Sequence, residues 1–168
     1  MHYFIFPEFD TTLYQASASR NTGLDEILEI EKTMNQSGGN VRVSRILIKF
    51  DLAEISRSIV RGQIATDAKY YLNMYDANPT ELSYSQSLYA YPISASWVPG
   101  EGFRADNPKT QEGATWEFRD GISEKTYWGR AEDTAVSSSG GAWFSSSFAS
   151  QSFEYETRDM RMDVTPIV

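Results

Sequence analysis

The stretch VRVSRILIKF, at residues 41–50, decides the fold class, because its apolar side chains alternate with polar ones in the period of two typical of a β-strand with one wet face. The apolar positions change parity part-way, from Val41 and Val43 to Ile46, Ile48 and Phe50. A β-bulge or a bend near Ser44 would reconcile the two halves. We therefore expect a curved strand, of the kind found in β-sandwiches.

The same alternation recurs on both sides of this stretch. It runs through LEIEK (28–32), AKYYLNMY (68–75), SLYAYPISASW (87–97), TWEFR (115–119) and FEYETRDMRMDV (153–164), the last with a register slip near Thr157. Turn-forming residues separate the segments, so we expect about eight to ten short strands. Because crossover helices are few, the pattern predicts an all-β fold, an antiparallel two-sheet jelly-roll sandwich.

One segment, DLAEISRSIVRG at residues 51–62, has helical spacing. Asp51 is placed as an N-cap with Glu54 three residues later, which resembles a capping box. Leu52, Ile55 and Ile59 share one face, and Gly62 is a plausible stop. The sequence predicts a short connector helix over about residues 51–61.

Length and composition limit the classes of protein to consider. The 168 residues suit one domain with its own core, and we expect a single β-sandwich domain over residues 1–168. The net charge of −8 disfavours nucleic acid and anionic membranes as partners. There is no cysteine, which excludes thiolate zinc sites and cysteine nucleophiles. The single histidine, His2, lies beside Met1, which disfavours a histidine-based catalytic triad. We expect no cofactor and no enzymatic activity.

Neither an export signal nor a membrane span is predicted. The first apolar run, Tyr3 to Phe6, has no lysine or arginine before it and is followed by Pro7. No later run approaches the ~18 apolar residues that a membrane-spanning helix needs.

Oxygen-bearing side chains form weak site candidates. Asp76, Asn78 and Thr80 alternate as in a calcium loop, but Pro79 interrupts them and an ordinary turn explains them better. A structural calcium ion is therefore not indicated. Most carboxylates lie on the polar parity of strands, which favours a solvated face over a catalytic pair.

Aromatic side chains are the stronger candidates for recognition, since they make up 14% of the chain. Tryptophan rings form stacking platforms for sugars, although core packing explains most of the four tryptophans here. The residues considered for a glycan or protein interface are Trp128, Trp143, Tyr71 and Tyr75, with Tyr89 and Tyr91 on the same tyrosine-rich surface.

The chain resembles the DNRLRE-type domain. The resemblance rests on TLYQASASRNTGLDEILEI (12–30), SRILIKFDLAEI (44–55) and AKYYLNMY (68–75), followed by WVPGEG (97–102), GATW (113–116), YWG (127–129), GGAWF (140–144) and DVTPIV (163–168). It implies a carbohydrate-binding-module-like jelly roll without enzymatic activity. The family pattern would continue into one more strand, so we expect a sandwich that lacks a final edge strand.

Two functional hypotheses follow from the resemblance and the exclusions. A free-standing, cysteine-free jelly roll without a signal is similar to accessory structural proteins of tailed phages. We therefore expect a virion component of the capsid, neck or tail, assembled in the host cytoplasm with other virion proteins or copies of itself. An open strand edge favours such pairing. The alternative is a carbohydrate-binding module for a surface glycan, at the cell surface or outside the cell as part of a larger protein.

Overall fold

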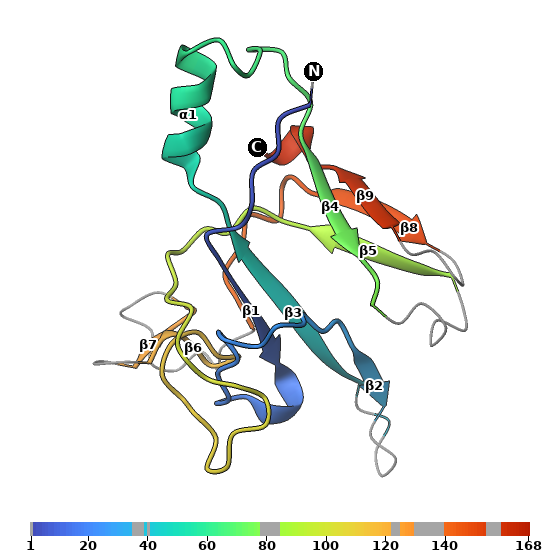
Figure 1. Cartoon of the computed structure of the whole chain (residues 1–168). Coiled ribbons are helices and arrows are strands. Elements are labelled where there is room, and N and C mark those ends of the chain that lie inside the picture. The colour runs from blue at the N-terminus through green and yellow to red at the C-terminus, as the bar shows by residue number, and fades with distance from the viewer. Residues whose placement is uncertain are drawn as a thin grey trace. The chain divides into compact units, whose positions relative to one another are not determined.

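The computed structural model of the chain describes residues 2–34, 39, 41–77, 85–121, 125–129, 140–153 and 159–168. Within them the fold is mostly strands with one short α-helix (Figure 1), which confirms the all-β class. The elements are β1 (Phe9–Tyr14), η1 (Gln15–Ser17), β2 (Lys32–Met34), β3 (Val41–Lys49), α1 (Leu52–Val60), β4 (Tyr71–Tyr75), β5 (Gln86–Ala90), β6 (Phe118–Asp120), β7 (Thr126–Tyr127), β8 (Ala149–Phe153), β9 (Asp159–Asp163) and η3 (Thr165–Ile167).

Contacts group the chain into two compact units. Unit 1 consists of Met1–Gln63 and Ala95–Ala142, and unit 2 of Ile64–Ser94 and Trp143–Val168. Each unit is therefore built from two separate stretches of the chain. The strands pair in small sheets of two or three. The jelly-roll sandwich and the single domain therefore both stay predictions.

Unit 1 contains an antiparallel sheet in the order β1-β3-β2. Strand β3 pairs with β1 from Lys49 to Ser44 and with β2 from Val43 to Val41, and neither register is shifted. Of the two alternatives considered near Ser44, the β-bulge is therefore wrong, and the bend stays a prediction. The strand instead changes its partner there, and the Ser44 hydroxyl donates to the carbonyl of Glu29 and accepts from the amide of Glu31, both at 2.7 Å.

The side chains of β3 that are buried also differ from those expected from the alternation. Leu47 and Ser44 are buried, while Ile46 and Ile48 are only half-buried. Three of these four residues are aliphatic, so alternation by itself does not decide which side faces the core. The ladder with β1 decides it, because Leu47 pairs with the fully buried Thr11.

Helix α1 begins and ends as predicted. The Asp51 carboxylate accepts hydrogen bonds from the amides of Ala53 at 2.8 Å and Glu54 at 3.2 Å. Gly62 has a φ of +69°, the left-handed conformation that ends many helices. The predicted apolar face is only partly buried, because Ile55 and Ile59 are half-buried and Leu52 is exposed.

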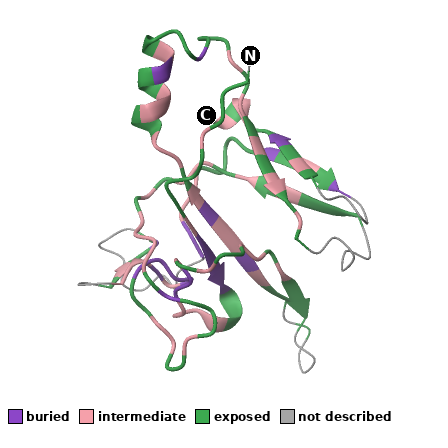
Figure 2. Ribbon diagram, in the orientation of Figure 1, coloured by how far each residue is buried: buried purple, intermediate pink, exposed green. Residues whose placement is uncertain are grey.

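The core of unit 1 lies on β1 and β3 and in the loops that cover them, where Figure 2 shows most of the buried residues. The alternation predicted for TWEFR is confirmed, since Trp116 and Phe118 are buried and Glu117 and Arg119 are half-buried. The buried hydrophobic side chains of this unit are Leu13, Tyr14, Leu47, Ala114, Trp116, Phe118 and Trp128.

Unit 2 contains two antiparallel ladders, β4 with β9 and β5 with β8, and β8 also contacts β9. The predicted alternation holds in β4, where Leu72 and Met74 are half-buried between exposed neighbours, and in β9, where Met162 is buried. The predicted slip near Thr157 lies outside the described residues. Buried apolar side chains here are Ile64, Ala149, Phe153 and Met162.

The strand predicted over LEIEK is shorter in the structure, because only Lys32 belongs to β2 and residues 28–31 precede it without regular structure. Among the described residues, no helix has the length and apolar character needed to cross a bilayer.

Candidate functional site

The ladder of β5 and β8 carries an exposed face whose side chains come from alternate residues of both strands. Tyr89 pairs with Ser150 and Ser87 with Ser152, so these four side chains share one side of the ladder. All four are exposed. The opposite side carries the half-buried Leu88 and the buried Ala149 and Phe153, which face the core of unit 2.

A row of aromatic rings continues this face beyond the paired residues. The ring centroid of Phe148 lies 5.8 Å from that of Tyr89 and 5.8 Å from that of Tyr91. The Tyr91 ring in turn lies 6.2 Å from Trp143. The antiparallel bridge of Ile93 with Trp143 and the hydrogen bond from the Phe144 amide to the Pro92 carbonyl at 2.9 Å hold the two segments together.

We call Ser87, Tyr89, Tyr91, Trp143, Phe148, Ser150 and Ser152 the uncharged face, because β5 and β8 carry no acidic or basic side chain. The Ser87 and Ser152 hydroxyls lie 2.9 Å apart across the ladder. Tyr89 and Phe148 are 58% and 50% exposed, so both rings present area to a ligand. The face combines open aromatic surface with neutral hydroxyl groups.

Tyr71 and Tyr75, two of the residues predicted from the sequence, lie on β4 and belong to the other ladder of unit 2. Both are exposed, but charged residues surround them, because Tyr71 pairs with Asp163 and Tyr75 with Asp159. The guanidinium carbon of Arg161 lies 4.1 Å from the Tyr71 ring centroid and covers one side of that ring. The sequence thus grouped four tyrosines that the structure divides between two ladders.

Trp128, a third predicted residue, lies in the core of unit 1. Its side chain is 3% exposed, and its Nε1–H donates to the carbonyl of Thr115 at 2.8 Å. The Thr115 hydroxyl accepts from the amides of Glu117 and Phe118, so Trp128 supports a tight turn. Trp143, by contrast, is half-buried on the uncharged face. Phe148 completes that face, and no motif or spacing in the sequence pointed to it.

Trp116 is buried against Arg45 of β3. The guanidinium carbon lies 4.8 Å from the indole centroid, and the arginine donates to the carbonyl of Gly140 at 2.9 Å. Burial lowers the pKa of Arg45 from its ordinary value. A Cβ on Gly140 would lie 2.6 Å from the indole ring, so this close approach requires glycine.

The loops of unit 1 converge on Asn21, which is fully buried. Its side-chain amide donates to the carbonyls of Pro99 and Ala114, each at 2.7 Å. Its Oδ1 accepts from the amides of Gly23 at 3.1 Å and Gly102 at 2.8 Å. One side chain therefore joins three loops, and its hydrogen-bonding capacity is used by the fold itself.

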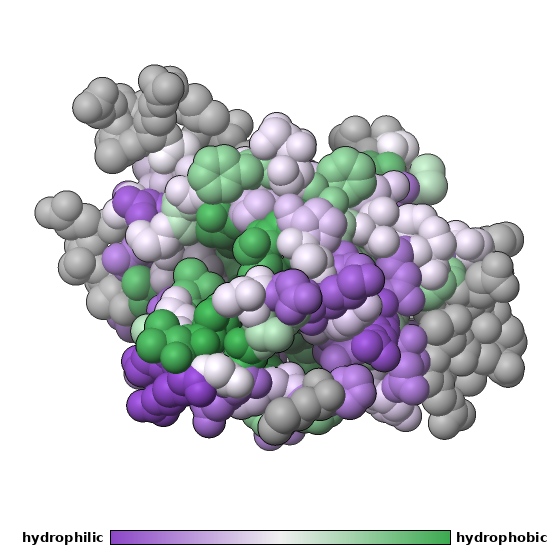
Figure 3. Space-filling model, turned by 90° about the horizontal axis from the view of Figure 1, so that it is seen from above, coloured by the Kyte–Doolittle hydropathy of each residue, from purple (hydrophilic) through white to green (hydrophobic). Residues whose placement is uncertain are grey.

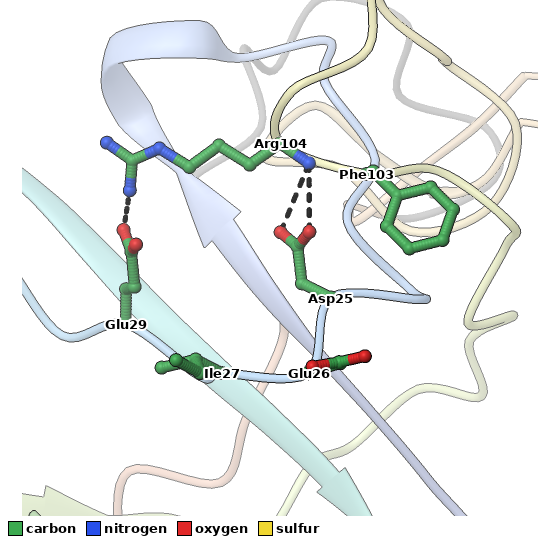
Figure 4. A pocket seen from close by; sticks show the side chains of 6 residues that line it. All are labelled: Asp25, Glu26, Ile27, Glu29, Phe103 and Arg104. Atoms are coloured by element: carbon green, nitrogen blue, oxygen red, sulfur yellow. Dashed lines mark hydrogen bonds and ion pairs between the residues drawn. The ribbon is translucent and has the colours of Figure 1, made fainter. Parts of the chain in front are cut away.

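A second polar feature of unit 1 is an open pocket of about 340 Å³ (Figure 4). Both oxygens of Asp25 accept from the amide of Arg104, and the Arg104 guanidinium forms an ion pair with Glu29. Glu29 also accepts from the hydroxyl of Tyr14 at 2.9 Å. The residues that line the pocket are Asp25, Glu26, Ile27, Glu29, Phe103 and Arg104.

The polar side chains of this pocket hold the surrounding loops together. Asp25 and Glu29 both have donors, and the Arg104 guanidinium also lies 4.7 Å from the ring centroid of Tyr14. Burial is the main cause that raises the pKa of Tyr14, so its phenol stays protonated at neutral pH. No cluster of three or more His, Asp or Glu side chains suited to a metal ion occurs in the part of the chain that the structure describes.

Asp76 of the predicted calcium-like string follows β4, whereas Asn78 and Thr80 lie outside the described residues. Comparisons with protein families, curated proteins and solved structures found no match for the chain. Membership of the DNRLRE-type family therefore stays a prediction, and the uncharged face is the candidate site that the geometry favours.

Proposed function

We propose that the chain is a non-enzymatic structural module that assembles through protein contacts, as a component of a phage virion in the capsid, neck or tail. The single observation that carries the proposal is the exposure of large apolar side chains in unit 1. Phe6, Met34 and Val60 are 83%, 71% and 87% exposed. Figure 3, which views the chain from the α1 end, displays hydrophobic residues at the surface beside strongly hydrophilic ones.

Met34 lies on β2, whereas Phe6 and Val60 belong to the N-terminal segment and to α1. Tyr3 is held there by its hydroxyl, which lies 3.0 Å from the hydroxyl of Ser58 on α1. Phe4 and Phe6, in the same segment, are exposed. A folded protein gains free energy when such area leaves water, at about 25 cal/mol per Å², and exposed apolar patches commonly mark protein interfaces.

The polar groups described above support a structural role in a second way. The side chains of Asn21 and Arg45 and the carboxylates of Asp25 and Glu29 hold loops and strands together. None of them forms the nucleophile and base arrangement that acyl or phosphoryl transfer requires. The resemblance to the DNRLRE-type domain likewise implies a module without enzymatic activity.

Mass spectrometry of purified phage particles tests the proposal, with the chain expected as a stoichiometric component. Sedimentation velocity of the full chain should show self-association, or co-sedimentation with virion proteins. Phe6→Ser combined with Val60→Ser should weaken the association, while Asp67→Ser, at an exposed polar position, is the matched control. A chain absent from the particles and monomeric with every virion protein would contradict the proposal.

A second candidate function is a carbohydrate-binding module, and the uncharged face favours it. Aromatic rings pack against the C–H groups of pyranose rings, and neutral hydroxyls bond sugar hydroxyls. Binding on a glycan array, followed by titration of the intrinsic tryptophan fluorescence with the glycan that binds, would test this function. An array without signal would remove it.

A further inference from the structure

We infer that the uncharged face binds a neutral oligosaccharide, which lies along the row of rings from Tyr89 to Trp143. This inference rests on the second candidate function and names its site and ligand class. It begins with geometry, because the rings of Tyr89, Phe148 and Tyr91 contact one another in sequence at 5.8 Å and all three are exposed. A chain of adjacent rings gives a ligand a continuous stacking surface.

The charge of the ligand follows from what the face lacks. No acidic or basic side chain occurs on β5 or β8, in a chain whose net charge is −8. An acidic sugar would find no cation on this ladder to replace the water that it loses, and the overall charge would repel it. The ladder of β4 and β9, in contrast to that of β5 and β8, is charged on its exposed side, where Asp159, Arg161 and Asp163 lie.

The polar groups of the face distinguish a sugar from an apolar protein surface. The Ser87, Ser150 and Ser152 hydroxyls lie beside the rings, and each both donates and accepts hydrogen bonds. The Ser87 and Ser152 hydroxyls already bond each other at 2.9 Å, but an apolar partner would offer no bond to the Ser150 hydroxyl, at about 1–3 kcal/mol for a buried group left unsatisfied. A neutral sugar offers C–H faces to the rings and hydroxyls to the serines.

The length of the face indicates an oligosaccharide. The four residue steps from Ser87 to Tyr91 span about 13 Å along an extended strand, and the Trp143 ring extends the row by a further contact of 6.2 Å. A single sugar ring covers only part of this length. We therefore expect affinity to rise with the number of linked sugar units.

The test applies the full chain to an array of neutral and acidic glycans and measures the strongest neutral oligosaccharide by titration calorimetry. Tyr89→Ala should weaken its binding about tenfold or more, because one stacking surface is lost. Ser150→Ala, which keeps every ring, should weaken it by a smaller factor. Tyr75→Ala, at an exposed tyrosine of the charged ladder, should stay within about twofold of the wild type. Near-UV circular dichroism checks that each variant is folded.

Each alternative result has a distinct meaning. Binding that Tyr89→Ala and Ser150→Ala leave unchanged would overturn this site, although carbohydrate binding itself would stand. A preference for acidic glycans would overturn the neutral ligand class. An array without any signal would overturn both the site and the second candidate function, and a virion protein that competes for the face and loses affinity with Tyr89→Ala would show a protein interface instead.

Discussion

Asn21 and Gly100 approach each other so closely that a Cβ at Gly100 would lie 2.5 Å from Oδ1 of Asn21. Gly100 also has a φ of +80°, in the left-handed region that favours glycine. The contact brings the loop before β2 against the loop that contains residues 99–102. Both loops belong to unit 1, where the same asparagine also bonds the carbonyl of Ala114.

Gly100→Ala should lower the free energy of unfolding by about 2–3 kcal/mol, because the new methyl group meets the carbonyl of Glu112 at 2.3 Å in a strained backbone conformation. Urea denaturation followed by tryptophan fluorescence measures the effect. Gly39→Ala is the matched control, since Gly39 has a φ of +68° but its Cβ would meet no atom within 4 Å. Equal losses in both variants would contradict a role for the close contact.

Asn21→Asp should destabilise the protein by about 3 kcal/mol or more at neutral pH, because a buried carboxylate would face the carbonyls of Pro99 and Ala114 without donating to either. Burial and these carbonyls would raise the pKa of the new carboxyl in the folded state. The variant should therefore regain stability relative to the wild type as pH falls, since a protonated acid can donate. Urea unfolding of both proteins across the acidic range measures this, and a pH-independent difference would contradict it.

Trp128→Phe should cost about 1–2 kcal/mol, because it removes the donor to the carbonyl of Thr115 and leaves that buried acceptor unsatisfied. Thermal unfolding followed by circular dichroism measures the change. Trp143→Phe, at the half-buried position of the uncharged face, is the control and should shift the midpoint less. A larger fall in the thermal midpoint for Trp143→Phe than for Trp128→Phe would contradict the assignment of Trp128 to the core and Trp143 to the uncharged face.

Asp106→Asn should lower stability at neutral pH, and the difference from the wild type should shrink as pH falls below 3.8. Hydrogen bonds from the Phe103 amide and then the Thr110 hydroxyl lower the pKa of Asp106 from that ordinary value. The carboxylate therefore stabilises the fold above the unfolded pKa, and this contribution is lost as pH falls through the folded pKa. Thermal midpoints across the acid range measure it, with Asp67→Asn as the control, and a constant difference at every pH would contradict the linkage.

The local features of the fold were predictable because they depend on neighbours in the sequence. Asp51 as N-cap, Gly62 after the helix, and the alternation around Leu72 and Met162 follow from capping and from the period of two. The buried side of β3 was not predictable from its own residues. Aliphatic side chains occupy both parities near Leu47, and the pairing with β1 selects one of them.

The candidate site was predictable only in part. Tyr89, Tyr91 and Trp143 were recognised as aromatic candidates, but Tyr71 and Tyr75 were grouped with them because all lie on alternating segments. The ladder pairings place Tyr71 and Tyr75 beside charged residues and bring Phe148 next to Tyr89 instead. Register between distant strands is a non-local property, so no spacing within one segment reveals it.

The sequence by itself determined the strand-rich class, the short helix, the negative charge and the lack of cysteine chemistry, since composition and short-range periodicity carry these properties. The tertiary structure alone decided that Asn21 joins three loops, that Trp128 is buried and that four rings meet on an uncharged face. Those outcomes depend on hydrogen bonds and packing between residues far apart in the chain, for which only the folded geometry brings the partners together.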